Sequence, residues 1–149
     1  MTFKARDAGF QARVRASFAS QAAMQTIGAE IVHVAPGEVD LRLPFREDLT
    51  QQHGFMHAGI IGAVADSACG YAAYTLMPAD AAVLSVEYKL NLMAPAAGEA
   101  FVARGRVKRA GRTLTVCTAD VFALKAGEER LVATMVGTMM TVTDRGLSG

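Results

Sequence analysis

The sequence predicts an α+β domain in which one curled antiparallel β-sheet wraps around a long apolar helix. Residues 59–77 contain a single charged side chain, Asp66, among apolar, small or neutral residues. A helix that is apolar nearly all round must be buried on several sides. The residues that follow it read as four strands, with clear alternation of apolar and polar side chains in the first two. Short turns between strands favour antiparallel pairing, and a single sheet can cover such a helix only by curling around it.

A membrane span is the alternative for this apolar segment, which as a helix would be about 28 Å long. A carboxylate near the centre of a span costs at least about 2.5 kcal/mol on insertion scales. Asp66 lies near the middle of residues 59–77, glycines dilute the apolar character, and no basic cluster flanks the segment. The sequence therefore favours a buried helix, and no membrane partner is expected. A lone carboxylate in such a helix is a candidate functional group.

The composition suits one folded domain, which we expect to span residues 1–149. Of the 149 residues, 52% are hydrophobic and 19% are charged, enough to form a sizeable core. A net charge of +1 gives no general attraction for nucleic acid or anionic membranes. The two cysteines, Cys69 and Cys117, lie in apolar surroundings and suggest neither disulfides nor a metal site. The start of the chain is polar and basic and does not resemble a secretory signal, so a cytoplasmic location is expected.

An amphipathic helix is expected at the start of the chain, over residues 7–21. Phe10, Val14 and Phe18 are spaced by four, with polar residues between them, and Asp7 is placed to cap the helix. We expect this helix to pack at the edge of the domain, without a functional role.

Strands are expected on both sides of the apolar helix. Residues 27–34 and 39–43 predict a hairpin, with Pro36 and Gly37 at its turn. A polar loop over residues 45–56 then leads directly into the apolar helix, a position where functional sites are common. The later strands are expected at residues 82–93, 100–109, 112–125 and 131–143, joined by hairpin turns and followed by a frayed tail at residues 144–149.

The loop before the apolar helix carries a recognisable pattern. Residues 51–59 read QQHGFMHAG, and Asp66 follows His57 by nine residues. This pattern resembles the hotdog-fold acyl-CoA thioesterases of the phenylacetate-degradation (PaaI-type) group, which have Asn, then Gly, then His-Gly-Gly, then Asp nine residues after the His. Gly54, His57, Gly59 and Asp66 match, whereas Gln51 replaces Asn and Ala58 replaces the first Gly of the pair. The resemblance covers about residues 22–142 and implies a hotdog fold, a curled sheet around a central helix.

The resemblance implies hydrolysis of acyl- or aryl-acyl-CoA to the free acid and CoA, with no cofactor other than the CoA of the substrate. Asp66 would act as a general base toward water or as a nucleophile, and the sequence leaves both roles open. The backbone N–H groups of Ala58 and Gly59 would form the oxyanion hole at the helix N-terminus. Asp66 lies about 12 Å further along the same helix. The resemblance therefore implies a homodimer, in a dimer of dimers, with sites between subunits.

Three further side chains receive roles from the resemblance. Gln51 would orient the water or the carboxylate, although its extra methylene changes its reach. Ser85 would hydrogen-bond near the carboxylate, or would be only an outward-facing strand residue. His57 would assist the carbonyl, or would only pack and cap the helix start. His53 and His57 lack a third ligand nearby, so no metal is expected.

Basic residues gather on one predicted strand and the turn after it. Arg104, Arg106 and Lys108 share a strand face, and Arg109 and Arg112 flank the turn. They form either a solvated hairpin that protects a sheet edge or a cradle for the phosphates of coenzyme A. The resemblance favours a cradle that includes Arg104, Lys108, Arg109 and Arg112, with Arg109 and Arg112 as the preferred pair. Aromatic residues do not interleave with these charges, so no nucleic-acid partner is expected.

Two other functions stay open at this stage. A hotdog hydratase or dehydratase would act on an enoyl or hydroxyacyl thioester without releasing a free thiol. A non-catalytic acyl-CoA-binding protein would be consistent with the departures at Gln51 and Ala58. The acyl pocket is expected to include Phe55, Met56, Tyr71 and Met93.

Overall fold

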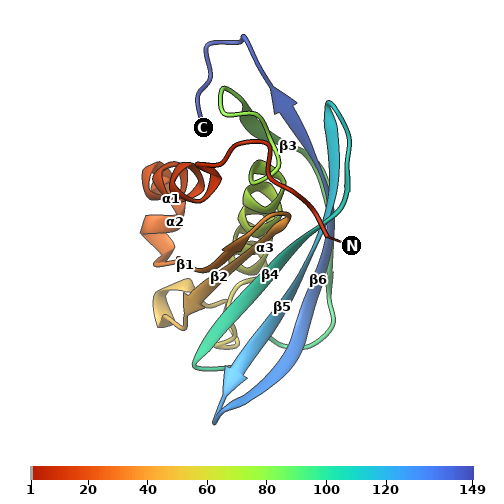
Figure 1. The fold of residues 1–149 in the computed structure, drawn as a ribbon. Coiled ribbons are helices and arrows are strands. Elements are labelled where there is room, and N and C mark those ends of the chain that lie inside the picture. The colour runs from red at the N-terminus through yellow and green to blue at the C-terminus, as the bar shows by residue number, and fades with distance from the viewer. Residues whose placement is uncertain (1) are drawn as a thin grey trace.

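The computed structural model describes residues 2–149 and consists of a six-stranded sheet curled around one long helix (Figure 1). The predicted α+β class and the central apolar helix are confirmed. In chain order the elements are α1 (Phe10–Ser20), α2 (Ala22–Ile27), β1 (Glu30–Ala35), β2 (Glu38–Pro44), the 3₁₀ helix η1 (Glu47–Leu49), α3 (Ala58–Tyr74), β3 (Ala82–Leu92), β4 (Ala100–Ala110), β5 (Leu114–Lys125) and β6 (Glu128–Val142).

The strand order in the sheet is β1-β2-β4-β5-β6-β3, and every neighbouring pair is antiparallel. The expectation that a hairpin turn joins β3 to β4 is wrong, because β3 pairs along its length with β6. Residues 93–99, which include Pro95, form a connection too long for a tight hairpin. β4 therefore pairs with β2 and β5 rather than with β3. β3 therefore lies at an open edge of the sheet, beside α3.

α3 lies against the concave face of the sheet and packs against β2, β3, β4, β5 and β6 (Figure 1). Small residues allow a close approach: a Cβ atom added at Gly105 of β4 would overlap the carbonyl oxygen of Ala68. Within residues 2–149, no helix is both long and apolar enough to cross a lipid bilayer. The core between α3 and the sheet includes Ile61, Val64, Ala65, Leu41, Phe101, Val121, Met135 and Met139, all almost fully buried.

The start of the chain differs from the prediction in two ways. α1 begins at Phe10 rather than near residue 7, and Asp7 binds the N–H of Gly9 and the guanidinium of Arg13, each at 2.9 Å. The short helix α2 was not predicted, and it delays the first strand to Glu30. Gly28 ends α2 in the left-handed conformation, with φ of 79°, a common way for a helix to stop.

α1 packs on the C-terminal half of α3, as Figure 1 shows. The rings of Phe18 and Tyr71 meet edge to face, with centroids 5.6 Å apart. Arg13 donates hydrogen bonds to the carbonyl oxygens of Tyr74 and Met77, at the end of α3. The expected packing role of α1 is confirmed, and α1 also borders the candidate site described below.

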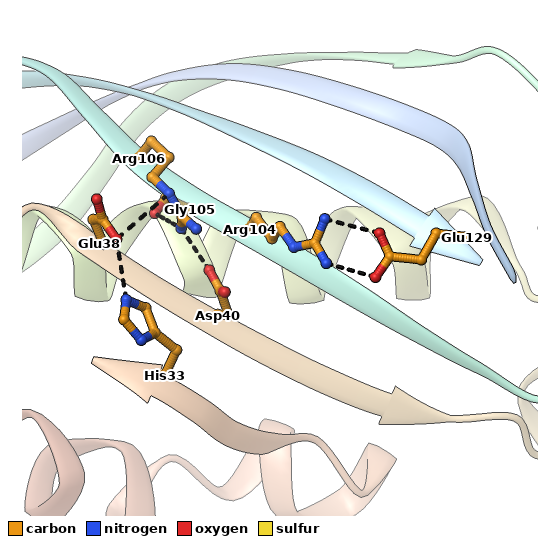
Figure 2. A network of polar contacts seen from close by, with 7 residues as sticks. All are labelled: His33, Glu38, Asp40, Arg104, Gly105, Arg106 and Glu129. Atoms are coloured by element: carbon orange, nitrogen blue, oxygen red, sulfur yellow. Dashed lines mark hydrogen bonds and ion pairs between the residues drawn. The ribbon is translucent and has the colours of Figure 1, made fainter. Parts of the chain in front are cut away.

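Charged side chains connect strands across the outer face of the sheet (Figure 2). In register, Glu38 lies opposite Arg106 and Asp40 opposite Arg104. Such exposed ion pairs contribute only about 0–1 kcal/mol each, but they fix where the arginine side chains lie. The ion pairs are Arg106–Glu38, Arg106–Asp40 and Arg104–Glu129, and His33 forms a hydrogen bond with Glu38.

Candidate active site

The candidate site is centred on the carboxylate of Asp66, in the middle of α3. The hydroxyl of Ser85, on β3, donates a hydrogen bond to Asp66 Oδ1 at 2.7 Å. Burial raises the pKa of Asp66, and the hydrogen bond from Ser85 only partly opposes this effect. A carboxylate with a raised pKa, held in place by one donor and beside a cavity, is a candidate base or nucleophile.

Ser85 reaches Asp66 because β3 contains a bulge. Ser85 pairs with Met139 and Glu87 pairs with Thr138, so Val86 is the extra residue between two paired positions. Met139 is fully buried under α3, which places Ser85 on the inner side of the sheet. Strict alternation would put Ser85 on the opposite face from Tyr88, which is half exposed but whose hydroxyl lies beside Gly62 of α3. The alternative of an outward-facing Ser85 is therefore wrong, while its part in the chemistry stays a prediction.

A cavity of about 320 Å³ opens beside Asp66. It is open to solvent and is lined by α1, α3, β3 and residues 147–149. Sequence reasoning missed the α1 side of this cavity because α1 was expected only to pack, and no spacing in the sequence links α1 to Asp66. The polar side chains that line the cavity are Ser17, Ser20, Gln21, Asp66, Ser67, Tyr71, Ser85 and Ser148.

The start of α3 is capped by His57. Its Nδ1 atom accepts a hydrogen bond from the N–H of Gly59 at 2.8 Å, so the proton of a neutral His57 ring sits on Nε2. The N–H of Gly59 therefore already has a partner, and its part in an oxyanion hole stays a prediction. In the part of the chain that the structure describes, the N–H of Ala58 has no acceptor. Capping is the role of His57 that this geometry supports.

Gln51 organises the loop that leads into α3. Its Oε1 atom accepts hydrogen bonds from the N–H groups of His53, at 2.5 Å, and Phe55, at 3.3 Å. The backbone N–H of Gln51 also binds the carbonyl oxygen of Phe55. The predicted role in orienting a water or carboxylate would therefore fall to the side-chain NH₂ group alone.

A second cavity, of about 410 Å³, lies at the start of α3. Phe55, Met56 and Met93 line it together with Gln51 and Ala58, and its walls are mainly apolar. The expected acyl pocket is thus corrected: three of its four residues lie here, whereas Tyr71 lines the cavity beside Asp66. The two cavities are separate because Ala58 and Asp66 are about 12 Å apart along the helix axis.

The predicted phosphate cradle is not a single group in the structure. Arg104 binds Glu129 through two hydrogen bonds, at 3.0 and 2.6 Å, and its guanidinium stacks over the ring of Phe122 (Figure 2 shows the ion pair). It lies about 17 Å along β4 from Arg109, at about 3.4 Å per residue. Lys108, Arg109 and Arg112 are exposed at the β4–β5 turn. Arg104 is therefore a structural cation of the outer face, away from the other three.

The two cysteines belong to the core. Cys69 and Cys117 are fully buried, and neither forms a disulfide. Burial raises the pKa of both thiols, that of Cys117 to about 12, so both stay protonated and weakly nucleophilic at neutral pH. Across residues 2–149, no three His, Cys, Asp or Glu side chains gather to hold a metal ion.

The chain is similar to an archaeal protein and to a bacterial protein of known structure. A protein of Saccharolobus solfataricus, named as a candidate esterase, SSO2140, is 28% identical over 111 residues, covering 74% of this chain and 76% of that protein. The crystal structure of a thioesterase family protein from Silicibacter pomeroyi superposes with a TM-score of 0.89 and 53% identity, covering 91% of this chain and 99% of that one.

The likeness to the phenylacetate-degradation group is more distant. The PaaI protein of E. coli, from the phenylacetic acid degradation operon, gives a TM-score of 0.81 at 18% identity and covers 89% of this chain and 93% of that one. At this identity the similarity supports the hotdog fold alone. The sequence profile of the thioesterase superfamily matches residues 53–129, just over half of the chain and including the whole of α3. The chain therefore belongs to the thioesterase superfamily and has its hotdog fold.

Proposed function

We propose that the protein hydrolyses acyl- or aryl-acyl-CoA thioesters, with Asp66 as general base or nucleophile. The observation that carries the proposal is the Asp66 carboxylate itself, held by Ser85 at 2.7 Å beside a cavity. Membership of the thioesterase superfamily favours hydrolysis over hydration of the same kind of substrate. Placement within the phenylacetate-degradation group stays a prediction from the sequence pattern.

The proposed reaction replaces the C–S bond of the thioester with a C–O bond from water. Attack on the carbonyl carbon moves negative charge onto the carbonyl oxygen, and a preorganised N–H donor stabilises that charge. Ala58 offers such a donor at the N-terminus of α3, where the helix dipole is also favourable. Collapse of the intermediate expels the CoA thiolate, which leaves as the thiol once it takes a proton. Ionised Asp66 either removes the proton of the attacking water, or attacks the carbonyl itself, expels the thiolate and forms an anhydride that water then hydrolyses to the free acid and Asp66.

One chain cannot place both groups on one carbonyl. The N–H of Ala58 and the carboxylate of Asp66 lie about 12 Å apart along α3 and border different cavities. A two-fold pairing of identical chains solves this problem, because each contact between residue i and residue j is repeated as j and i. The proposed site therefore combines Asp66 of one subunit with the start of α3 in the other.

The open edge of the sheet is the surface that we assign to this dimer. β3 presents Val86, Tyr88 and Leu92 to solvent, each with about half of its surface exposed, at 53%, 49% and 54%. These residues lie on the strand that carries Ser85, next to α3. An unpaired apolar edge is a template for pairing with another strand. A second copy on this edge would bring the two α3 helices together.

Replacing Val86 with lysine is expected to convert the proposed dimer into monomers. Activity should fall in proportion to the fraction of dimer that is lost. A charged side chain at the centre of an apolar interface must be desolvated without a partner, which opposes association. Sedimentation velocity would give the mass, and thiol release the activity. Val136→Lys is the matched control, since Val136 is 50% exposed but lies on the outer face of β6. An unchanged dimer in Val86→Lys would contradict this interface. The native mass would also show whether two dimers associate.

The reaction class is tested by free-thiol release from a panel of medium-chain acyl-CoA, phenylacetyl-CoA and hydroxybenzoyl-CoA. Release that depends on Asp66 would support thioester hydrolysis at this site. Tight binding of the same esters without thiol release would instead favour a binding protein. Conversion of an enoyl-CoA to its hydroxyacyl form would favour a hydratase.

For the CoA phosphates we propose the exposed cations of the β4–β5 turn, led by Arg109 and Arg112. A charge-assisted hydrogen bond contributes about 1.5–3 kcal/mol, so replacing both arginines with glutamine should raise KM about tenfold or more, with the effect on KM rather than kcat. Steady-state kinetics at several salt concentrations would measure this effect. Arg104→Gln is the control, because Arg104 is already paired with Glu129. An equal rise of KM in both variants would argue against a local phosphate site.

A further inference from the structure

The cavity beside Asp66 extends from the carboxylate toward α1. Asp66 and Ser85 form one wall of the cavity. The far wall consists of Ser17 on α1, Gln21 immediately after α1, and Tyr71 on α3. α1 borders this far side, since it packs on α3 through Phe18 and Tyr71. A substrate carbonyl at Asp66 would therefore have a space of limited length in the direction of α1. That space suits the acyl group, because the CoA arm must lead out to solvent.

The size of this cavity limits the acyl group. An apolar cavity of about 150 Å³ holds one benzene molecule, and the cavity here has about 320 Å³. Tyr71 follows Asp66 by five residues, which is about 7–8 Å along the helix axis. An extended chain advances about 3.3–3.6 Å over three bonds, so about six bonds match this length scale. The space therefore fits one aromatic ring or a chain of about six carbon atoms.

The far wall of the cavity is polar, in contrast to the apolar cavity at the start of α3. Ser17 Oγ and Tyr71 OH lie 3.2 Å apart and share one hydrogen bond, which leaves one of the two hydroxyl hydrogens free to donate. Ser67 donates to Oε1 of Gln21 at 3.3 Å, and in residues 2–149 the Nε2 group of Gln21 has no acceptor. Burial raises the pKa of Tyr71, so its hydroxyl stays protonated. The far wall thus offers hydrogen-bond donors at a fixed distance from Asp66.

Gly70 gives the cavity part of its depth. It lies one turn after Asp66 on α3, and a Cβ atom added there would meet no atom within 4 Å. Gly70 nevertheless has little exposed surface, so the open space at this position belongs to the cavity that it lines. A side chain at this position would occupy the space that we assign to the acyl group.

We infer that the cavity between α1 and α3 binds the acyl group, and that Ser17, Gln21 and Tyr71 select acyl groups with a hydrogen-bonding substituent about six bonds from the thioester carbonyl. This inference rests on the proposed thioesterase function. It gives α1 a part in substrate selection, beyond packing.

The test compares 6-hydroxyhexanoyl-CoA with hexanoyl-CoA by their ratio of kcat/KM, measured as thiol release. A site built to hydrogen-bond a substrate hydroxyl discriminates against the analogue that lacks it, so the native ratio should be about tenfold or more. Tyr71→Phe keeps the ring that packs on Phe18 and removes one hydroxyl, and it should reduce the ratio toward one. Tyr74→Phe is the matched control on the same helix, because Tyr74 does not line this cavity and the ratio should stay at its native value.

A second variant tests the position of the acyl group by its bulk. Gly70→Leu should lower kcat/KM for both six-carbon esters at least tenfold more than for acetyl-CoA, which is too short to reach residue 70. A native ratio near one, an unchanged ratio in Tyr71→Phe, or equal losses for all esters in Gly70→Leu would each overturn the inference while leaving the thioesterase proposal intact. Absence of thiol release from every ester would instead overturn the proposed function, and the inference with it.

Discussion

Asp66→Asn is expected to lower kcat about 10²–10⁴-fold, the usual loss when a positioned acid–base group is removed. The amide keeps the size of the carboxylate, and its oxygen can still accept the hydrogen bond from Ser85. It can neither remove a proton from water nor attack a thioester efficiently. Thiol release under saturating substrate measures the effect. Asp80→Asn is the control, since Asp80 is exposed in the loop before β3. Near-native turnover of Asp66→Asn would exclude Asp66 from the mechanism.

The same variant is expected to be at least as stable as the native protein at pH 7. The pKa of Asp66 is raised from 3.8 in the folded chain, mainly by burial. A group with a raised folded pKa contributes stability below its unfolded pKa and loses that contribution as the pH rises through the folded pKa. At neutral pH the ionised carboxylate therefore opposes folding, and asparagine removes the charge. Urea unfolding at pH 7 would measure this, and a clear loss of stability would point to a structural role.

The raised pKa also fixes the direction of the pH dependence. The ionised form of Asp66 is the active form whether it is a base or a nucleophile. We therefore expect kcat/KM to fall as the pH falls, with a midpoint above the value of an ordinary aspartate. Ser85→Ala should move this midpoint further upward, because the hydrogen bond from Ser85 lowers the pKa of Asp66. A midpoint that does not respond to Ser85→Ala would argue against Asp66 as the titrating group.

Ala58→Pro is expected to reduce kcat about 10²–10³-fold, the loss seen when one oxyanion-hole donor is removed. Proline has no N–H, so this variant deletes the donor without adding a charge. The helix should tolerate it, because Ala58 is the first residue of α3, a favoured position for proline. His57 before it has φ of −61° and ψ of 137°, an extended conformation that suits a residue preceding proline.

Two measurements separate the loss of the donor from damage to the helix. Circular dichroism and urea unfolding of Ala58→Pro should match the native protein closely. Ala58→Gly keeps the N–H and should retain most of the activity, whereas the proline variant should not. The N–H of Gly59 cannot easily take over, since it is bound to His57 Nδ1 at 2.8 Å. Equal activity in the proline and glycine variants would remove Ala58 from the oxyanion hole.

The sequence alone determined the features that depend on neighbours along the chain. Residues 59–77 are apolar, small or neutral except for Asp66, which predicted a helix buried in a protein core rather than a membrane span. Alternation and turn residues placed most strand boundaries within three residues, because both signals are local. The spacing of His57, Gly59 and Asp66 identified the helix start and the carboxylate for the same reason.

Contacts between distant segments could not be read from the sequence. The bulge at Val86 turns Ser85 toward Asp66. The sequence of β3 does not predict this bulge, because a bulge depends on the register with β6. Glu129 neutralises Arg104 from a strand that is distant in sequence. α1 brings Ser17 and Gln21 to the cavity beside Asp66 because its apolar face packs on α3. The sequence thus identified the candidate carboxylate, whereas packing between distant segments set its hydrogen bond, its cavity and its raised pKa.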